Sequence, residues 1–308
     1  MIFENIKKIF RPIYVPLFEK IFFYRQRINF HKKKRLKRIK IMRTLSTIRY
    51  IKKNNVSISR YGDGEFGIIL NKLDIGFQQR SDDLAQALRN VLSSENNRLL
   101  ICLPRCMNYV YGMKSKANEF WHFYSINNYN DVSSLIYQSG KKNYVFGDTM
   151  LTRPYMDWKS RLSARIKFIA LMSIWKNKDL LIVEGEQTRL GVGNDLFDNA
   201  KSIKRILAPA KNAFSQYSQI KKCVLNHYNG EIVLLALGPT ATVLAADLSN
   251  NGIQALDIGH IDIEYMWYIM KAKEKIAIPN KFTNESFQKQ IIDCTDDKYL
   301  SQIIMKII

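Results

Sequence analysis

The sequence is poor in cysteine and contains no long apolar run. Its four cysteines are scattered among 308 residues, and none forms the Cys-x-x-Cys pair that is typical of zinc sites. This excludes a disulfide scaffold, and the thiols are expected to be reduced and buried. No apolar stretch approaches the ~20 residues that a membrane-spanning helix needs. The longest stretches, such as residues 232–237, have the length of buried strands.

The N-terminal region lacks both a secretory signal and an appreciable number of acidic residues. Lys7, Lys8 and Arg11 interrupt the first apolar residues, so the chain is expected to be cytoplasmic. Residues 1–45 hold 14 Lys or Arg and 2 Glu, a net charge of +12, and the remaining chain contributes +9 to the total of +21. We interpret residues 1–45 as a basic, amphipathic, helical extension and residues 46–308 as one domain.

Three interpretations of this extension compete. Apolar residues recur at roughly helical spacing among the cations, and the tract His31–Lys40 is the most densely charged. Such segments bind anionic membranes, which predicts a peripheral contact of residues 1–40 with the inner face of the cell membrane. A solvated, partly helical extension explains the pattern equally well. Nucleic-acid binding is the weakest interpretation, and no nucleic acid is expected as a partner.

From about residue 42, helical patterns alternate with short aliphatic runs. The runs predict strands at 56–60, 98–103, 144–146, 180–183, 202–207, 232–237 and 253–256. Helical patterns lie between them, at 82–92, 160–175, 213–225, 240–248 and 261–271. Continuous apolar strands separated by helices are typical of a parallel sheet covered on both faces. The predicted fold is therefore α/β, a doubly wound, mostly parallel sheet in a single domain, with the last 30 residues helical or irregular.

Unusual polar residues follow most of the predicted strands. In doubly wound sheets, ligands bind outside the carboxyl ends of the strands. The segments in question are Tyr61–Glu65, Pro104–Arg105, Gly147–Thr149, Glu184–Asp195, Gly238–Thr240 and Asp257–Glu264. Because these ends meet at one edge of a parallel sheet, the sequence predicts a binding site there.

Asp63 and Glu65 are the predicted metal ligands. In an extended segment the side chains at i and i+2 point the same way, and Gly62 and Gly64 let the backbone approach a ligand. Two carboxylates suit Mg²⁺ or Mn²⁺, which would keep open positions for diphosphate oxygens. A solvated turn is the alternative, but the position after a strand and next to Arg60 favours a functional site.

Two further segments, residues 238–240 and residues 260–264, are candidate sites. Gly238, Pro239 and Thr240 begin a predicted helix, whose first N–H groups can bind an anion while Thr240 caps it. An ordinary strand-to-helix turn would use the same residues.

His260, Asp262 and Glu264 form a dense ionisable cluster after the last predicted strand. The histidine could contact a phosphate, and a carboxylate could accept a proton from an incoming hydroxyl group. A structural histidine is the alternative of comparable weight.

Together these motifs resemble the bacterial glycosyltransferases of the GT-D type. The matching segments are RYGDGE (60–65), GDT with RPY (147–155), VEGEQTRLGVGNDLFDNAKSIKRILAPAKNAF (183–214), LALGPTATVLAADL (235–248) and LDIGHIDIEY (256–265). They occur in the family's order and cover most of residues 55–285, whereas residues 1 to about 45 lie outside the resemblance.

The resemblance implies a Rossmann-like domain that transfers a hexose, glucose for a known member, from a UDP-sugar. The implied acceptor is a glycan or lipid-linked glycan in bacterial surface polysaccharide or glycoprotein synthesis, and Mn²⁺ or Mg²⁺ would bind through Asp63 and Glu65. We assign the donor pocket to Arg60, Gly62, Glu184, Arg189, Gly193, Asn194, Gly238, Pro239 and Thr240. The catalytic candidates are His260, Asp262 and Glu264.

The sequence departs from the family at one position of its last motif. Where the family often continues Glu-Tyr-Glu-Trp, this chain has Glu264-Tyr265-Met266-Trp267. If the missing carboxylate is the family's base, Asp262 or Glu264 must take the acceptor proton here. Another metal-dependent phosphoryl or nucleotidyl transferase is the main alternative function, and a basic membrane- or nucleic-acid-binding adaptor is a further one.

Overall fold

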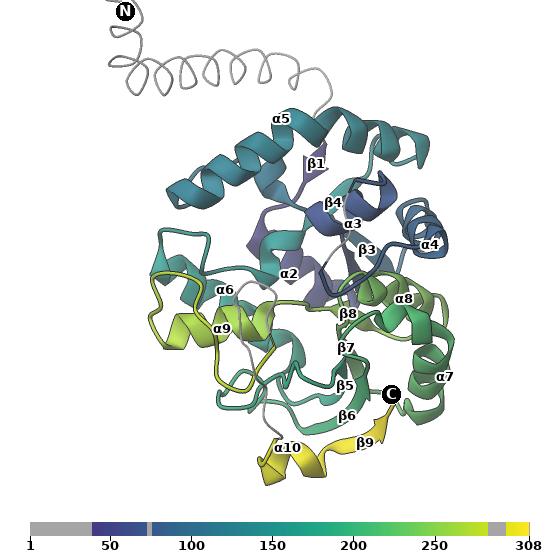
Figure 1. Cartoon of the computed structure of the whole chain (residues 1–308), viewed down its shortest axis with the longest axis vertical. Coiled ribbons are helices and arrows are strands. Elements are labelled where there is room, and N and C mark those ends of the chain that lie inside the picture. Colours follow the sequence, from purple (N-terminus) through teal and green to yellow (C-terminus); the bar gives the residue numbers. More distant parts are fainter. Residues whose placement is uncertain (1–38, 73–75, 283–293, 308) are drawn as a thin grey trace, which may run out of the picture.

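The residues that the computed structural model describes, 39–72, 76–282 and 294–307, form one sheet of nine strands (Figure 1). The strand order is β1-β4-β3-β2-β8-β7-β5-β6-β9, and every pairing in it is parallel. The strands are β1 Lys40–Ile41, β2 Ser57–Arg60, β3 Leu99–Leu103, β4 Val145–Asp148, β5 Asp179–Gly185, β6 Ser202–Ala208, β7 Ile232–Ala236, β8 Ala255–Asp257 and β9 Ile303–Lys306. The predicted α/β parallel sheet is therefore confirmed.

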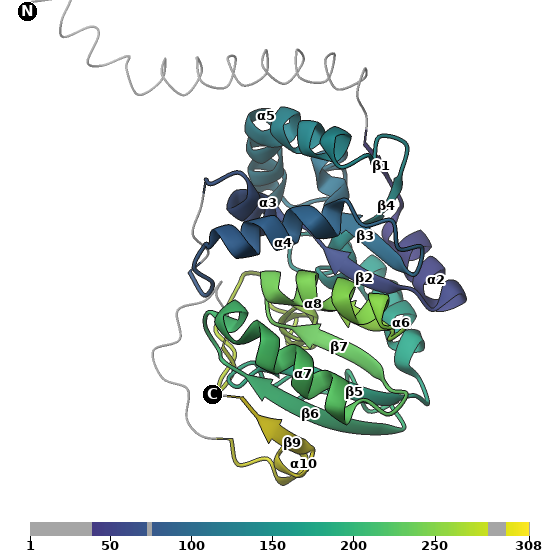
Figure 2. The ribbon, with the colours of Figure 1, turned by 90° about the vertical axis from the view of Figure 1, so that its right-hand side faces the viewer.

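Helices cover both faces of this sheet. One face packs against α2 (Thr44–Asn54), α6 (Arg161–Trp175) and α9 (Ile261–Ile269). The helices on the other face are α3 Asp63–Ile69, α4 Asp82–Leu92, α5 Ser115–Gln138, α7 Tyr217–His227 and α8 Pro239–Asn250. In Figure 2, α4, α8 and α7 lie one below another in front of the strands. Short 3₁₀ helices occupy Arg105–Met107, Thr149–Thr152 and Ala213–Gln216, and α10 (Asp297–Ser301) precedes β9.

Strand β5 illustrates why the apolar runs are continuous. Its side chains alternate between the two faces, so Leu180 and Ile182 pack in the core under α6 and α9. Leu181 and Val183 pack in the core under α7 and α8. All four side chains are fully buried. A strand that is buried on both faces needs apolar residues at every position, which is the pattern read from the sequence.

All seven predicted strands are present, and their ends differ from the predicted ends by at most two residues. The helix α5 was not predicted, although it is the longest of the described helices. Five of its six buried residues, Trp121, Ser125, Tyr129, Val132 and Ile136, do follow a helical spacing, and the sixth is Ser133. Asparagine and serine between them have poor helix propensity and obscure that pattern.

Other corrections concern the ends of the chain. The last residues were expected to be helical or irregular, yet β9 forms an edge of the sheet beside β6. At the other edge, β1 pairs with β4, so Lys40 and Ile41 belong to the sheet although they lie within the predicted extension. Residues 1–38 lie outside the described residues, and the predictions for them remain predictions. In the described part, no helix is long and apolar enough to cross a membrane.

Candidate functional site

A pocket of about 380 Å³ opens at the carboxyl edge of the sheet, a size within the roughly 300–1,000 Å³ of small-molecule sites. Segments that follow six different strands contribute to its wall, among them Arg60, Thr149, Thr188, Ala210, Gly238 and His260. The pocket therefore lies where doubly wound sheets bind their ligands.

Half of the predicted site residues line this pocket and half do not. The lining residues are Arg60, Gly62, Asp63, Glu65, Gly238, His260 and Asp262. Those that do not line it are Glu184, Arg189, Gly193, Asn194, Pro239, Thr240 and Glu264. The lining also contains residues that the sequence did not single out, such as Phe77, Gln78, Arg153 and Phe282.

Arg60 is held firmly at the end of β2. Its Nε and Nη2 donate to the Asp257 carbonyl and carboxylate at 2.8 and 2.7 Å, and Nη1 donates to the Thr152 hydroxyl at 2.8 Å. Gly259 has a positive φ of 40°, and a Cβ there would clash with the Arg60 guanidinium. The glycine thus leaves room for a fixed positive charge at the pocket, with only 12% of the Arg60 side chain exposed.

The geometry expected of Asp63 and Glu65 is wrong. Both residues lie in the first turn of α3 and not in an extended segment. Successive helical residues are about 100° apart, so side chains at i and i+2 diverge. Glu65 folds back, and its Oε2 accepts a hydrogen bond from the Gly62 N–H at 2.7 Å, whereas Asp63 is exposed at the helix start. Even so, both carboxylates line the pocket.

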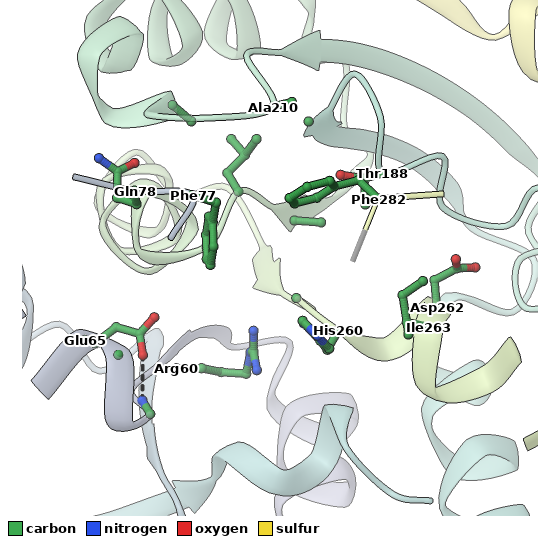
Figure 3. Close-up of a pocket in the computed structure, with 18 of the residues that line it drawn as sticks. Arg60, Glu65, Phe77, Gln78, Thr188, Ala210, His260, Asp262, Ile263 and Phe282 are labelled. Atoms are coloured by element: carbon green, nitrogen blue, oxygen red, sulfur yellow. Dashed lines mark hydrogen bonds between the residues drawn. The ribbon is translucent and has the colours of Figure 1, made fainter. Parts of the chain in front are cut away.

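The carboxyl group of Glu65 has a raised pKa. Burial, reinforced by the nearby Asp257 carboxylate, raises the pKa of Glu65 to about 7. Figure 3 shows its carboxyl group at the same end of the pocket as Arg60 and His260. A cation bound beside Glu65 would favour its ionised form and so offset the burial.

The two carboxylates fit only one type of metal site. The described residues contain no group of three or more His, Cys, Asp or Glu side chains that could hold a metal ion. Mg²⁺ and similar cations are also bound by one or two carboxylates, with substrate phosphates and water completing the shell. Each carboxylate, as one ligand, is compatible with that type of site, and metal binding through Asp63 and Glu65 remains a prediction.

The start of α8 differs from the sequence expectation in one respect. Thr240 is buried and makes no capping hydrogen bond, so its predicted capping role is wrong. Its hydroxyl instead lies 3.4 Å from Gln78 Oε1. Gly238, immediately before the helix, faces the pocket with a positive φ of 57°. Pro239, which has no N–H group, occupies the first helical position.

Asp262 reaches the pocket but is occupied by internal partners. Its Oδ2 forms an ion pair with Lys281 at 2.6 Å, and both side chains are almost fully buried. Its Oδ1 accepts hydrogen bonds from the Gly191 N–H and the Asn194 amide, each at 2.8 Å. Asp262 therefore holds the loop after β5 and the segment around Lys281 in place.

Glu264 also acts as an internal anchor. Its Oε2 accepts hydrogen bonds from the backbone N–H groups of Tyr155 and Met156, both at 2.9 Å. Burial raises the pKa of Glu264 to about 7, with the nearby Arg153 opposing the shift. Glu264 stabilises the segment after β4 and does not line the pocket.

The predicted donor residues in the loop after β5 mainly stabilise that loop. Glu184 is fully buried, accepts a hydrogen bond from the Leu190 N–H at 2.7 Å and pairs with Arg205 at 2.6 Å. Arg189 has a positive φ of 50° and donates from Nη1 to the Asn280 carbonyl at 2.9 Å. These contacts determine the path of the loop.

The end of the same loop faces a second hollow. Gly193 and Asn194 line it together with Arg205 and Tyr299, away from the main pocket. Asn194 also lies 3.2 Å from the Met266 sulfur. Met266, which stands where the family often has a glutamate, is therefore a packing partner of this loop.

Comparisons with known proteins agree with the motif resemblance. The sequence model described as "Glycosyltransferase GT-D fold" matches residues 58–286. Glycosyltransferase GlyD of Streptococcus pneumoniae is 38% identical over 264 residues, which are 85% of this chain and 32% of that protein. A probable glycosyl transferase, Gly, of Streptococcus gordonii is 38% identical over 270 residues, 87% of this chain and 39% of that protein. The chain thus spans about a third of the length of these curated relatives.

Solved structures give the same result. One of them is described as a highly conserved domain of unknown function 1792 with a distinct glycosyltransferase fold. It superposes with a TM-score of 0.83 and 37% identity, and the match covers 90% of this chain and 99% of that one. A glycosyltransferase structure from Streptococcus sanguinis superposes with a TM-score of 0.80 and 36% identity, covering 88% and 100%. The predictions of a GT-D-type transferase and of an enzyme are therefore confirmed, and the chain belongs to the GT-D glycosyltransferase family.

Proposed function

We propose that this chain transfers a hexose, glucose in the first instance, from a UDP-sugar to a glycan or lipid-linked glycan acceptor, with Mn²⁺ or Mg²⁺ as cofactor. The products would enter bacterial surface polysaccharides or glycoproteins. The observation that carries the proposal is the pocket itself, where Arg60, Asp63, Glu65 and His260 face one space at the carboxyl edge of a GT-D sheet.

The charged side chains of Arg60, Asp63 and Glu65 suit a departing diphosphate. Breaking the bond between sugar and phosphate leaves negative charge on the diphosphate, and fixed positive charge beside it accelerates the reaction. Arg60 supplies such a charge, since three hydrogen bonds hold it at the pocket. The start of α8, where Gly238 lines the pocket beside Phe77, adds the positive end of a helix dipole from another part of the wall. A cation bound by Asp63 and Glu65 would neutralise further charge on the leaving group.

The acceptor hydroxyl must lose a proton, and His260 is the best placed of the three candidates. Both oxygens of Asp262 are engaged by internal donors, and Glu264 does not line the pocket. His260 lines the pocket at the end where Arg60 and Glu65 lie (Figure 3). A neutral imidazole nitrogen can accept a proton near neutral pH. We assign that role to His260 and positioning roles to the two carboxylates.

The test is a screen of nucleotide sugars with the purified full chain, with glycan acceptors, with Mn²⁺ or Mg²⁺ present and with EDTA. We expect UDP to be released from one UDP-hexose in the presence of the cation and an acceptor. Release of pyrophosphate instead would support a nucleotidyl transferase, and full activity in EDTA would refute the metal cofactor.

The proposed membrane contact of residues 1–40 depends on their charge pattern alone. Removing those residues should weaken sedimentation with anionic vesicles and leave transfer to a soluble acceptor unchanged. If transfer to the soluble acceptor and vesicle binding fell together, the extension would be part of the enzyme domain.

A further inference from the structure

Helix α6 exposes a stripe of apolar side chains on the outside of the domain. Leu162, Ile166 and Ile169 are 67%, 47% and 57% exposed. At about 100° per residue, these three positions lie within roughly 60° of one another around the helix axis. The other side of the helix, with Phe168 and Leu171, is already buried in the core. A contiguous apolar stripe of this kind marks an interaction surface, whereas single exposed apolar side chains are ordinary.

The end of α9 extends this apolar stripe at the start of α6. The Arg161 guanidinium lies over the Tyr268 ring, 4.9 Å from its centroid, and Nη2 donates to the Tyr268 carbonyl at 3.3 Å. The next two residues along α9, Ile269 and Met270, are exposed. Exposed apolar side chains from two helices therefore lie beside each other around Arg161.

The charged side chains around the stripe are basic. Helix α2 lies beside its far end, because Lys52 Nζ donates to Ser173 Oγ at 3.2 Å, one turn beyond Ile169. In Figure 2 the two helices lie together at the right-hand side of the domain. Neither α2 nor α6 contains an aspartate or a glutamate, and the exposed basic residues of the two helices are Arg49, Lys52, Lys53, Arg161 and Arg165. Beyond α9, the exposed Glu274 stands between Lys273 and Lys275.

We propose that this surface, the α6 face, binds an anionic lipid bilayer. Leu162, Ile166 and Ile169 would enter the interface between headgroups and acyl chains, while the basic side chains around them contact the anionic headgroups. A second copy of the chain is a poor occupant, because two identical basic surfaces repel each other. Nucleic acid would engage the cations but leave the apolar stripe in water.

Helix α9 connects the α6 face to the pocket. The helix begins after His260, which lines the pocket, and ends at Ile269 in the α6 face. Its nine residues span about 13 Å. A bilayer on the α6 face would therefore hold the pocket close to the membrane surface. This contact belongs to the folded domain and not to residues 1–40, and it does not depend on the proposed reaction.

The test is co-sedimentation of the full chain with vesicles of phosphatidylcholine and phosphatidylglycerol in equal parts, and with vesicles of phosphatidylcholine alone. We expect binding to the mixed vesicles to be the stronger. Ile166→Glu and Ile169→Glu should each weaken it about tenfold, since each variant loses an apolar contact and adds a repelled charge. Arg165→Gln should weaken it about fivefold, and Ile169→Trp should bind at least as tightly, because tryptophan favours the interface.

The matched control is Phe123→Glu on α5, at a position that is 59% exposed. It adds the same charge away from the α6 face and should bind the mixed vesicles like the unchanged chain. If it weakens binding as much as Ile166→Glu and Ile169→Glu do, only the net charge matters and the proposal is overturned. Thermal unfolding of all three glutamate variants should match that of the unchanged chain, since all three positions are exposed.

Three further outcomes would also overturn the proposal. The first is that the unchanged chain binds neither type of vesicle. The second is that Ile166→Glu and Ile169→Glu bind the mixed vesicles as tightly as the unchanged chain, which would assign vesicle binding to another part of the protein. The third is that sedimentation velocity shows the unchanged chain to be a dimer and these two variants to be monomers, which would make the α6 face an interface between copies. Because every readout is vesicle binding or mass, none of these outcomes bears on the proposed sugar transfer.

Discussion

Two acidic pairs in this protein have the same spacing but different surroundings. Asp63 and Glu65 begin α3 after β2, and Asp262 and Glu264 begin α9 after β8. Asp63 is exposed at the pocket, and Glu65 makes one short hydrogen bond within its own helix start. Asp262 and Glu264 are fully buried and accept from backbone, amide and lysine donors.

Spacing alone therefore does not distinguish a pair of carboxylates that is open to the pocket from a pair that is engaged by internal donors. Both pairs follow a strand at the same edge of the sheet, and both contain a glutamate whose pKa is raised to about 7 by burial. What differs is the number of internal donors around each pair. Both oxygens of Asp262 and Oε2 of Glu264 accept from internal donors and so have little left to offer a ligand, whereas Oε1 of Glu264 is buried without a hydrogen-bond partner.

The largest expected effect is on enzyme turnover and concerns the first pair, Asp63 and Glu65. Asp63→Asn and Glu65→Gln should each lower metal-dependent UDP-sugar turnover by about a hundredfold or more, since stabilisation of the leaving charge is worth several kcal/mol. Thermal unfolding should remain close to that of the unchanged protein. Asp83→Asn and Glu119→Gln, at exposed positions, are the matched controls and should retain activity. Retained activity in the pocket variants would remove the distinction between the pairs.

The next effect is on stability and concerns the second pair. Asp262→Asn removes the charged partner of the buried Lys281 and should lower the free energy of unfolding by about 3 kcal/mol. Urea denaturation measures this change. Adding Lys281→Met should recover part of the loss, because the buried charge is then removed as well. A single variant as stable as the unchanged protein would mean that Asp262 is not an anchor.

An effect that is at most of similar size depends on pH and concerns Glu264. Burial raises the pKa of this carboxyl group from the ordinary 4.5 to about 7, so the folded state holds its proton more tightly than the unfolded state. Its contribution to the free energy of unfolding is therefore largest below pH 4.5 and is lost as the pH rises to about 7. Glu264→Gln should remove that loss, while its side-chain oxygen still accepts from Tyr155 and Met156.

Denaturation at several pH values measures this difference. Between pH 4 and pH 8, the stability of Glu264→Gln relative to the unchanged protein should improve by up to about 3 kcal/mol. Glu119→Gln, at an exposed position, should follow the pH profile of the unchanged protein. If the pH profile of Glu264→Gln also runs parallel to that of the unchanged protein, the folded-state pKa of Glu264 is ordinary and the burial argument is wrong.

The sequence by itself determined the parallel sheet and the edge that carries the pocket. Apolar runs such as residues 180–183 have no polar position to face water, so a strand covered on both faces is the arrangement that buries them. The polar segments that end those runs must then meet at one edge. The recurrence of RYGDGE and LDIGHIDIEY in family order added the family, which physical patterns alone do not identify.

Tertiary structure decided which side chains at that edge remain open to a ligand. Asp262 and Glu264 resemble Asp63 and Glu65 in sequence, but donors from distant segments, such as Lys281 and the amide of Asn194, engage Asp262. Phe77 and Phe282 line the pocket from loops, where no local sequence pattern marks them as site residues. Their places depend on hydrogen bonds and ion pairs between residues far apart in the chain, and such contacts leave no periodic signal in the sequence.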